Sequence, residues 1–326
     1  MKICVFGAGA IGGHVATRLA LGGAETSVVA RGAQREAIAA HGLTVSARDG
    51  VHTARPRVGS PAELGVQDAV IVTVKAPALP GVAQAIGPLL GPDTTVAFVM
   101  NGIPWWYFDR HGGPLEGRRL PEIDPGDVIR NAVGPERTLG GVVYSACTVT
   151  EPGHIHVENE VNRVILGELD NSASPRAEAI AAYLTKGGMS GEVSRDIRRD
   201  VWTKLASNLA FGPFAILARM GSGAATHDPV VRTAMVRGMK EVISIAEALG
   251  QPVDLDAEKR VAAISSSGHK ASILQDLELG RPMEVAAMFR APLELARMAE
   301  VETPTLDLAV ALATMQAKGA GLYEAA

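Results

Sequence analysis

The sequence predicts an α/β protein in which a doubly wound parallel sheet is followed by an all-helical half. In the first part of the chain, continuous apolar runs alternate with helical stretches, as is typical of parallel strands that helices cover on both faces. From about Ser194 onward the apolar periodicity is helical only. A chain of 326 residues can form two domains with separate cores. We expect an α/β domain over 1–193 and a helical domain over 194–326.

The first element is a strand that runs directly into a glycine-rich turn. Residues 3–12 read Ile-Cys-Val-Phe-Gly-Ala-Gly-Ala-Ile-Gly, and a helix of small residues and a second strand follow. Gly7 allows a tight turn, Gly9 lets the backbone approach a pyrophosphate, and Gly12 lets the helix pack near the sheet. The N-terminus of that helix then faces the phosphates. This Rossmann-type pattern predicts a dinucleotide site formed by Gly7, Ala8, Gly9, Ala10, Ile11 and Gly12.

The end of the second strand, 26–30, distinguishes between the two nicotinamide cofactors. An acidic residue there would accept hydrogen bonds from a ribose 2′-hydroxyl, but this chain has Arg31, with Arg35 one turn later. A guanidinium can hold a 2′-phosphate with two parallel hydrogen bonds, whereas a carboxylate would repel it. We therefore expect NADP(H), held in part by Arg31. The alternative is that these arginines are solvated surface charges, which suits Arg35 better.

Two later strands are expected to end beside the same cofactor. The apolar runs 69–74 and 95–100 predict buried parallel strands, and the stretch between them, about 79–90, predicts a helix. Lys75 and Asn101 follow these runs directly. Because ligands bind beyond the carboxyl ends of such strands, we expect both residues to contact the cofactor. For either residue alone, a simple turn position is the alternative.

Residues 104–137 predict an excursion from the sheet. Four aromatic residues stand together at 105–108 in a chain with only 4% aromatic residues, so they either cap a ligand pocket or bury a loop or subunit contact. We favour the structural interpretation slightly. Alternating residues then predict antiparallel strands over 141–149, 154–158 and 163–169, with a turn at 151–153. We interpret His154 and His156 as exposed residues, and we expect no metal site.

Composition excludes several functional classes. A net charge of −4 leaves no basic field for nucleic acid. No uncharged apolar run is long enough to span a membrane. Cys4 and Cys147 fit no metal spacing or disulfide framework, and Cys4 is expected to be a small core residue. Because the first strand begins at once, we expect no signal peptide and a cytoplasmic location.

The second half predicts a long amphipathic helix over 196–217, bent at Pro213, and four further helices. These are expected over 227–249, 255–265, 270–279 and 282–299. Lys204 and Asn208 lie four residues apart, so they project from one face of a largely apolar helix. Lysine is rarely buried unless it is paired or lines a polar site, so Lys204 is the strongest candidate from spacing alone. An all-helical half behind a dinucleotide domain usually leaves a ligand cleft between the domains.

Two further polar positions in this half are weaker candidates. Ser272 and Asp276 are one turn apart on a later helix, and from spacing alone Ser272 is an ordinary surface residue. Glu284 is expected in the first helical turn after Pro282, where the helix dipole favours a carboxylate.

Six segments together resemble the ketopantoate reductase (2-dehydropantoate 2-reductase) family, and they extend over nearly the whole chain. They are the glycine turn 7–12 and the segments 74–76, 101–103, 202–208, 272–276 and 280–284. The lysine–asparagine helix and the serine-to-glutamate segment are specific, whereas many families share the glycine turn. The resemblance implies the reduction by NADPH of a 2-oxo acid, 2-dehydropantoate in pantothenate biosynthesis, to the 2-hydroxy acid.

The resemblance also implies a role for each matching residue. Lys204 corresponds to the catalytic general acid, and Glu284 to an active-site glutamate that contacts the substrate and supports the lysine. Asn208 and Ser272 correspond to substrate-binding residues. The cofactor-side positions are matched by Arg31, Lys75 and Asn101.

The chain departs from the family pattern on the substrate side. Gly212 and Ser222 stand where the family has asparagines, and 285–290 replaces an acidic and Asn-Gly pattern. We expect Arg290 to form a surface salt bridge rather than to bind a substrate carboxylate. Because such changes alter which substrate groups can be paired, a reductase of the same fold for a different 2-oxo acid is one alternative. A non-catalytic NADPH sensor is another. Apolar surfaces in the helical half could form a homodimer.

Overall fold

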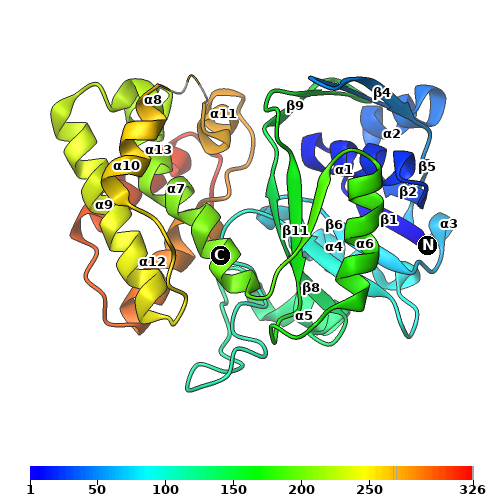
Figure 1. The fold of residues 1–326 in the computed structure, drawn as a ribbon, viewed down its shortest axis with the longest axis horizontal. Coiled ribbons are helices and arrows are strands. Elements are labelled where there is room, and N and C mark those ends of the chain that lie inside the picture. The colour runs from blue at the N-terminus through cyan, green and yellow to red at the C-terminus, as the bar shows by residue number, and fades with distance from the viewer. Residues whose placement is uncertain (267, 269, 325–326) are drawn as a thin grey trace. The chain divides into compact units, whose positions relative to one another are not determined.

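The computed structural model of the chain describes residues 1–266, 268 and 270–324, which divide into two compact units (Figure 1). Unit 1 comprises Met1–Met100, Trp105–Arg119 and Gly126–Ile197. Unit 2 comprises Asn101–Pro104, Leu120–Pro125 and Arg198–Ala326. Two short pieces of the first half of the chain, 101–104 and 120–125, therefore belong with the helical second half.

Unit 1 is built on an eight-stranded sheet with the order β12-β11-β8-β7-β6-β1-β2-β5. The six strands from β5 to β8 are parallel, whereas β11 runs antiparallel to β8 and parallel to β12. Every residue of β6 and β7 is buried, because helices cover both faces of a doubly wound sheet. The predicted fold class is confirmed. The strands are β1 Lys2–Phe6, β2 Glu25–Val29, β5 Arg57–Gly59, β6 Ala69–Val72, β7 Thr95–Val99, β8 Thr138–Tyr144, β11 Arg163–Gly167 and β12 Ser190–Val193.

A second sheet of four strands has the order β4-β3-β10-β9 and was not predicted. Its strands are β3 Leu43–Ala47, β4 Gly50–Ala54, β9 Cys147–Glu151 and β10 His154–Val157. The prediction of one antiparallel strand over 141–149 is wrong, because β8 ends at Tyr144 beside parallel β7 and β9 begins at Cys147 in the other sheet. Alternation in the sequence indicates a strand but does not specify its partner. The predicted turn at 151–153 does join antiparallel β9 and β10.

Helix α1 (Ala10–Leu21) packs against β1 and β2 of the main sheet and against β3, β9 and β10 of the second sheet. This double burial explains its small residues, since a Cβ on Gly13 would stand 2.6 Å from Cδ1 of Ile155. The predicted helix over 79–90 ends at Ala85, and a 3-10 turn follows where Gly87-Pro88 interrupts it. The other helical segments are α2 Gly32–His41, α3 Pro61–Leu64, η1 Ala76–Ala78, α4 Leu79–Ala85, η2 Gly87–Leu89, η3 Pro125–Asp127, α5 Val128–Val133 and α6 Pro175–Lys186.

The aromatic residues at 105–108 belong to the core of unit 1, as the structural interpretation expected. All four side chains are at most 3% exposed. The Trp106 ring lies against Gly140 of β8, where a Cβ would stand 2.6 Å from two ring atoms. Gly140 therefore provides the space in the sheet for this ring.

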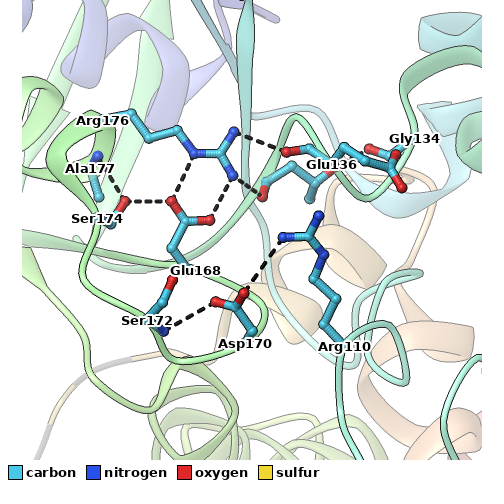
Figure 2. A network of polar contacts seen from close by, with 10 residues as sticks. Arg110, Gly134, Glu136, Glu168, Asp170, Ser172, Ser174, Arg176 and Ala177 are labelled. Atoms are coloured by element: carbon cyan, nitrogen blue, oxygen red, sulfur yellow. Dashed lines mark hydrogen bonds and ion pairs between the residues drawn. The ribbon is translucent and has the colours of Figure 1, made fainter.

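A buried polar network fixes the connection between β11 and α6 in unit 1 (Figure 2). The Glu168 carboxylate accepts hydrogen bonds from Ser174 Oγ at 2.7 Å and from Arg176 Nε and Nη2 at 2.7 and 2.6 Å. Arg176 also donates to the Thr138 carbonyl oxygen at 3.2 Å, at the start of β8. Ser174 in turn caps α6 by accepting from the Ala177 amide. The network therefore joins two neighbouring strands to the N-terminus of a helix.

Unit 2 is helical apart from its two short connecting pieces. Its longest helix, α7, continues through Pro213 without ending there. The helix predicted over 282–299 is instead a π-helical turn followed by α12, and α13 was not predicted. None of the described helices is long and apolar enough to cross a membrane. The helices are α7 Ile197–Ala218, α8 Ser222–Ala225, α9 Pro229–Ala248, α10 Ala257–Ser265, α11 Ser272–Glu278, the π-helical turn η4 Ala286–Arg290, α12 Ala291–Met298 and α13 Pro304–Gly319.

Candidate active site

The glycine turn of unit 1 leads from β1 into α1 and leaves open space at the start of the helix. Gly7 follows β1 directly and has φ +104°, a value that favours glycine. Gly9 caps the N-terminus of α1, and a Cβ there would meet no atom within 4 Å, so the space beside it is open. A Cβ on Gly12 would overlap the Gly7 carbonyl oxygen. The open position at the start of a helix fits the phosphates of a dinucleotide.

Two side chains that the sequence analysis did not identify hold this turn in place. Thr73 Oγ1 donates to the Gly7 carbonyl oxygen at 2.8 Å, and Gln34 Nε2 donates to the Ala8 carbonyl oxygen at 2.7 Å. Gln34 Oε1 also accepts from the Gly153 amide at 3.0 Å. Thr73 stands just past β6, a position that could have been noticed in the sequence. For Gln34, one residue before Arg35, no sequence signal exists.

The basic residues predicted on the cofactor side lie in unit 1 at different strand ends. Arg31 follows β2, is exposed, and makes no ion pair within the part of the chain that the structure describes. Arg35 is paired with Glu63 at 3.0 Å, which agrees with a surface role. Lys75 follows β6, is half-buried, and caps the 3-10 turn at 76–78. Arg31 is thus placed where an additional anion, such as a 2′-phosphate, could be bound.

In unit 2, three segments distant in sequence meet around Lys204. Lys204 Nζ on α7 donates to Asn101 Oδ1 at 2.6 Å, and Asn101 Nδ2 donates to Glu284 Oε2 at 3.5 Å. Lys204 is half-buried, and Glu284 is 6% exposed. The two residues expected to do the chemistry are therefore bridged by Asn101. Asn101 was predicted on the cofactor side, and its contact with the cofactor stays a prediction.

A π-helical turn explains how Asn101 reaches this position. The Ala291 amide bonds to the carbonyl oxygen of Ala286, five residues back, rather than to that of Ala287. The Ala287 carbonyl oxygen accepts instead from the Ile103 amide at 2.8 Å. Gly102 has φ +82°, and a Cβ there would overlap the Ala287 carbonyl group. The extra residue in the turn therefore frees the oxygen that holds segment 101–104.

Glu284 does not lie within the first helical turn, as was predicted, but immediately before the helical residues. Its carbonyl oxygen accepts from the Met288 amide at 3.0 Å, so Glu284 borders the first turn. Its side chain is buried rather than solvated. Because a carboxylate is costly to bury without partners, this burial favours a functional position over an ordinary helix start.

The predicted substrate residues also lie in unit 2. Asn208 follows Lys204 by one turn of α7 and is half-buried, whereas Ser272 is the exposed first residue of α11. One turn beyond Asn208, a Cβ on Gly212 would stand 3.0 Å from the Phe289 ring. The glycine that departs from the family pattern thus allows this ring to approach α7. Arg290 forms an ion pair with Glu122 at 2.6 Å, as expected.

The chemistry of this cluster is that of proton transfer. An ammonium group can donate a proton, an adjacent carboxylate favours the charged lysine, and an amide can bridge the two. Among the described residues, no group of three or more His, Cys, Asp or Glu side chains is arranged to hold a metal ion. Lys204, Asn101 and Glu284 are therefore suited to an acid–base step beside a separate redox cofactor.

Comparisons with known proteins cover both units. The family model described as ketopantoate reductase PanE/ApbA matches residues 3–171, and the model of its C-terminal part matches 196–317. The chain is 43% identical to a 2-dehydropantoate 2-reductase of Mesorhizobium japonicum, with 99% of this chain and 100% of the relative covered.

Solved structures show the same relationship. A candidate ketopantoate reductase from Ralstonia solanacearum is 40% identical with a TM-score of 0.91, over 98% of this chain and 99% of that one. D-mandelate dehydrogenase in complex with NADH and anilino(oxo)acetate is 21% identical with a TM-score of 0.81, over 99% and 100% of the two chains, and shares the fold. Two family models that together cover most of the chain, and a relative at 43% identity over its full length, establish that the chain belongs to the ketopantoate reductase PanE/ApbA family.

Proposed function

We propose that the chain is an NADPH-dependent oxidoreductase that reduces a 2-oxo acid, 2-dehydropantoate, to the 2-hydroxy acid pantoate, a step of pantothenate biosynthesis. Its family consists of ketopantoate reductases. The relative from Mesorhizobium japonicum, which matches this chain over its full length, is named a 2-dehydropantoate 2-reductase. The observation that supports this chemistry in the chain itself is the Lys204–Asn101–Glu284 cluster.

In the proposed reaction, Lys204 is the general acid. NADPH, when bound, supplies the hydride that reaches the ketone carbon. The ketone oxygen then gains negative charge, which the Lys204 ammonium stabilises and neutralises by donating its proton. Glu284 favours the protonated lysine. Asn101 accepts from Lys204 at 2.6 Å and so orients the ammonium.

The remaining candidate residues are assigned to binding. We propose that Asn208 and Ser272 hold the substrate, the latter through its carboxylate. The glycine turn 7–12, Arg31 and Lys75 hold the cofactor, with Arg31 on the 2′-phosphate. The open space beside Gly9 and the exposed guanidinium of Arg31 support this assignment.

The experiment that tests the proposal replaces the general acid. Lys204→Ala should lower the turnover of 2-dehydropantoate about 10²–10⁴-fold, the range that one general acid typically contributes, while NADPH binding is retained. Turnover is followed through NADPH absorbance and binding through NADPH fluorescence. Lys240→Ala is the matched control, because Lys240 is an exposed lysine of the same unit that pairs with Glu258 at 3.3 Å. Near-normal turnover of Lys204→Ala would exclude the mechanism.

Two other functions remain to be distinguished from this one. Gly212 favours a reductase for a different 2-oxo acid. The family has a polar side chain at this position, whereas here the Phe289 ring packs close to the glycine. A panel of 2-oxo acids with aliphatic, hydroxylated and aromatic side chains separates the two. An NADPH sensor predicts tight NADPH binding without reduction of any acid in the panel.

A homodimer and a cytoplasmic location stay predictions. The outer face of α13 presents exposed apolar side chains at helical spacing, Leu308, Leu312 and Met315. An antiparallel two-fold pairing of α13 would set Leu308 of one copy against Met315 of the other and bring the acidic first turn near the basic last turn. Analytical ultracentrifugation of Met315→Glu tests the dimer, and cell fractionation tests the location.

A further inference from the structure

We propose that Glu122, Arg290 and Tyr323 form a clamp that positions Glu284 beside Asn101 and Lys204. None of these three side chains was assigned a role in the chemistry above. The inference rests on the proposed function, because it concerns the geometry of the proposed acid and its carboxylate.

The centre of the clamp is one carboxylate oxygen. Glu122 Oε1 accepts a hydrogen bond from Tyr323 Oη at 2.6 Å and forms an ion pair with Arg290 Nε at 2.6 Å. The Glu122 side chain is 17% exposed, and Tyr323 is 9% exposed. The three residues come from the connecting piece 120–125, from the last position of the π-helical turn, and from the chain's C-terminal tail. Hydrogen bonds to an ionised carboxylate are stronger than neutral ones, so this junction is well suited to hold three segments together.

The clamp fixes both flanks of Glu284. On the N-terminal side, the Met283 amide donates to the Leu322 carbonyl oxygen at 2.9 Å, one residue before Tyr323. On the C-terminal side, Arg290 closes the turn that begins at 286. The tail therefore holds the residue before Glu284 through its backbone, and it holds the end of the following turn through Tyr323 and Glu122. Glu284 lies between two anchors that are bonded to each other.

The same turn also holds Asn101. Its Ala287 carbonyl oxygen accepts from the Ile103 amide at 2.8 Å, and the Gly102 backbone packs directly against Ala287. A shift of the turn would therefore move Glu284 and Asn101 together. The Asn101–Glu284 contact is already long at 3.5 Å, so a further small displacement would break it.

The Tyr323 hydroxyl keeps its proton at neutral pH. Burial, the hydrogen bond to Glu122 and the negative charge of Glu122 all raise the pKa of Tyr323 well above its usual value. Tyr323 therefore remains a hydrogen-bond donor throughout the neutral and mildly alkaline range. Any change in a pH profile on removal of its hydroxyl must then come from another group.

The test measures kcat and kcat/KM against pH for Tyr323→Phe and Glu122→Gln, with NADPH binding and thermal melting measured on the same samples. We expect kcat to fall about tenfold, because small misplacements near the reacting groups are costly. The alkaline limb of the profile, which reports loss of the Lys204 proton, should move to lower pH, because a displaced carboxylate favours the ammonium less. NADPH binding should not change. Arg290→Lys, which can keep the ion pair, should retain more activity than Arg290→Met.

The control is Asp307→Asn, which breaks the exposed ion pair of Asp307 with Arg297 in the same unit and should leave all readouts unchanged. If Glu122→Gln does not fold, Tyr323→Phe gives the same readouts, since it removes a single oxygen atom. A fall in kcat without movement of the alkaline limb, or activity within twofold of the wild type, would overturn the clamp. If Lys204→Ala is inactive while the clamp variants are normal, only the clamp is wrong. An active Lys204→Ala would reject the proposed function itself.

Discussion

The molecule contains two polar networks in which a buried glutamate is linked to a cation, and they differ in both origin and chemistry. In unit 1, Glu168 binds Arg176, eight residues away, and Ser174 of the same strand–helix connection (Figure 2). In unit 2, Asn101 links Glu284 to Lys204, and the two hydrogen bonds join residues 103 and 183 positions apart.

The nature of the cation separates the two networks by function. The guanidinium of Arg176 remains charged in proteins and forms two parallel hydrogen bonds, so it stabilises structure but does not deliver a proton. A lysine ammonium can give up its proton and be tuned by its neighbours. The comparison teaches that burial and pairing alone do not identify an active site. The proposed site in unit 2 differs from the network in unit 1 because its cation can release a proton and because its residues come from distant segments.

The largest expected effect is on turnover, when the lysine of the unit 2 network is replaced by arginine, the cation of the unit 1 network. Lys204→Arg keeps the positive charge near Asn101 but removes a group that can donate a proton near neutral pH. We expect turnover of 2-dehydropantoate to fall at least about 10²-fold, nearly as much as in Lys204→Ala. Steady-state assays of the two variants test this. Recovery of more than a tenth of the wild-type turnover by the arginine would mean that charge stabilisation alone suffices.

Breaking the first network should affect stability and not chemistry. Arg176→Ala leaves Glu168 buried without its cation, which we expect to lower the free energy of unfolding by about 3 kcal/mol. The surface pair Arg48–Glu160, in which both side chains are at least 66% exposed, is the control, and Arg48→Ala should cost less than about 1 kcal/mol. Urea denaturation measures both. The kcat of folded Arg176→Ala should equal that of the wild type, and a large loss of kcat would show that the network of unit 1 also contributes to turnover.

Arg31 extends the comparison to an arginine that makes no ion pair among the described residues. If it binds the 2′-phosphate, Arg31→Ala should raise the KM for NADPH about tenfold, corresponding to about 1.4 kcal/mol, and leave the KM for NADH nearly unchanged. Arg35→Ala is the control, because Arg35 already pairs with Glu63. Equal effects of Arg31→Ala on both cofactors would remove the evidence for a phosphate contact.

The smallest expected effect is on the acid sensitivity of unit 1. Burial acts to raise the pKa of Glu168, but the hydrogen bonds from Arg176 and Ser174 outweigh it, so the pKa lies below its ordinary value of 4.5. The ionised carboxylate therefore contributes stability above about pH 4.5, and this contribution is lost as the pH falls through the folded-state pKa. Glu168→Gln should lose less stability than the wild type between pH 7 and the acid range in urea titrations. An identical decline would assign the acid sensitivity to other groups.

Several elements could be predicted because their signals lie in adjacent residues. The apolar runs that became β6 and β7, and the helical periodicity of α7, are local patterns, and the structure confirms both. Where partners had to be chosen, prediction was weaker. Apolar and polar residues alternate over 141–149 as in one strand, yet the two ends of this segment pair in different sheets. The prediction failed because alternation does not specify which strand lies alongside.

The sequence by itself determined the α/β-then-helical organisation, and it predicted the dinucleotide turn and a role for Lys204, because these signals lie in residues close together along the chain. Only the tertiary structure brought Asn101 between Lys204 and Glu284 and tied Glu122 to Arg290 and Tyr323. The physical reason is the π-helical turn at 286–290. It frees one backbone carbonyl group to bind a segment 184 positions earlier, at Ile103, and no periodicity in the sequence marks which carbonyl group that is.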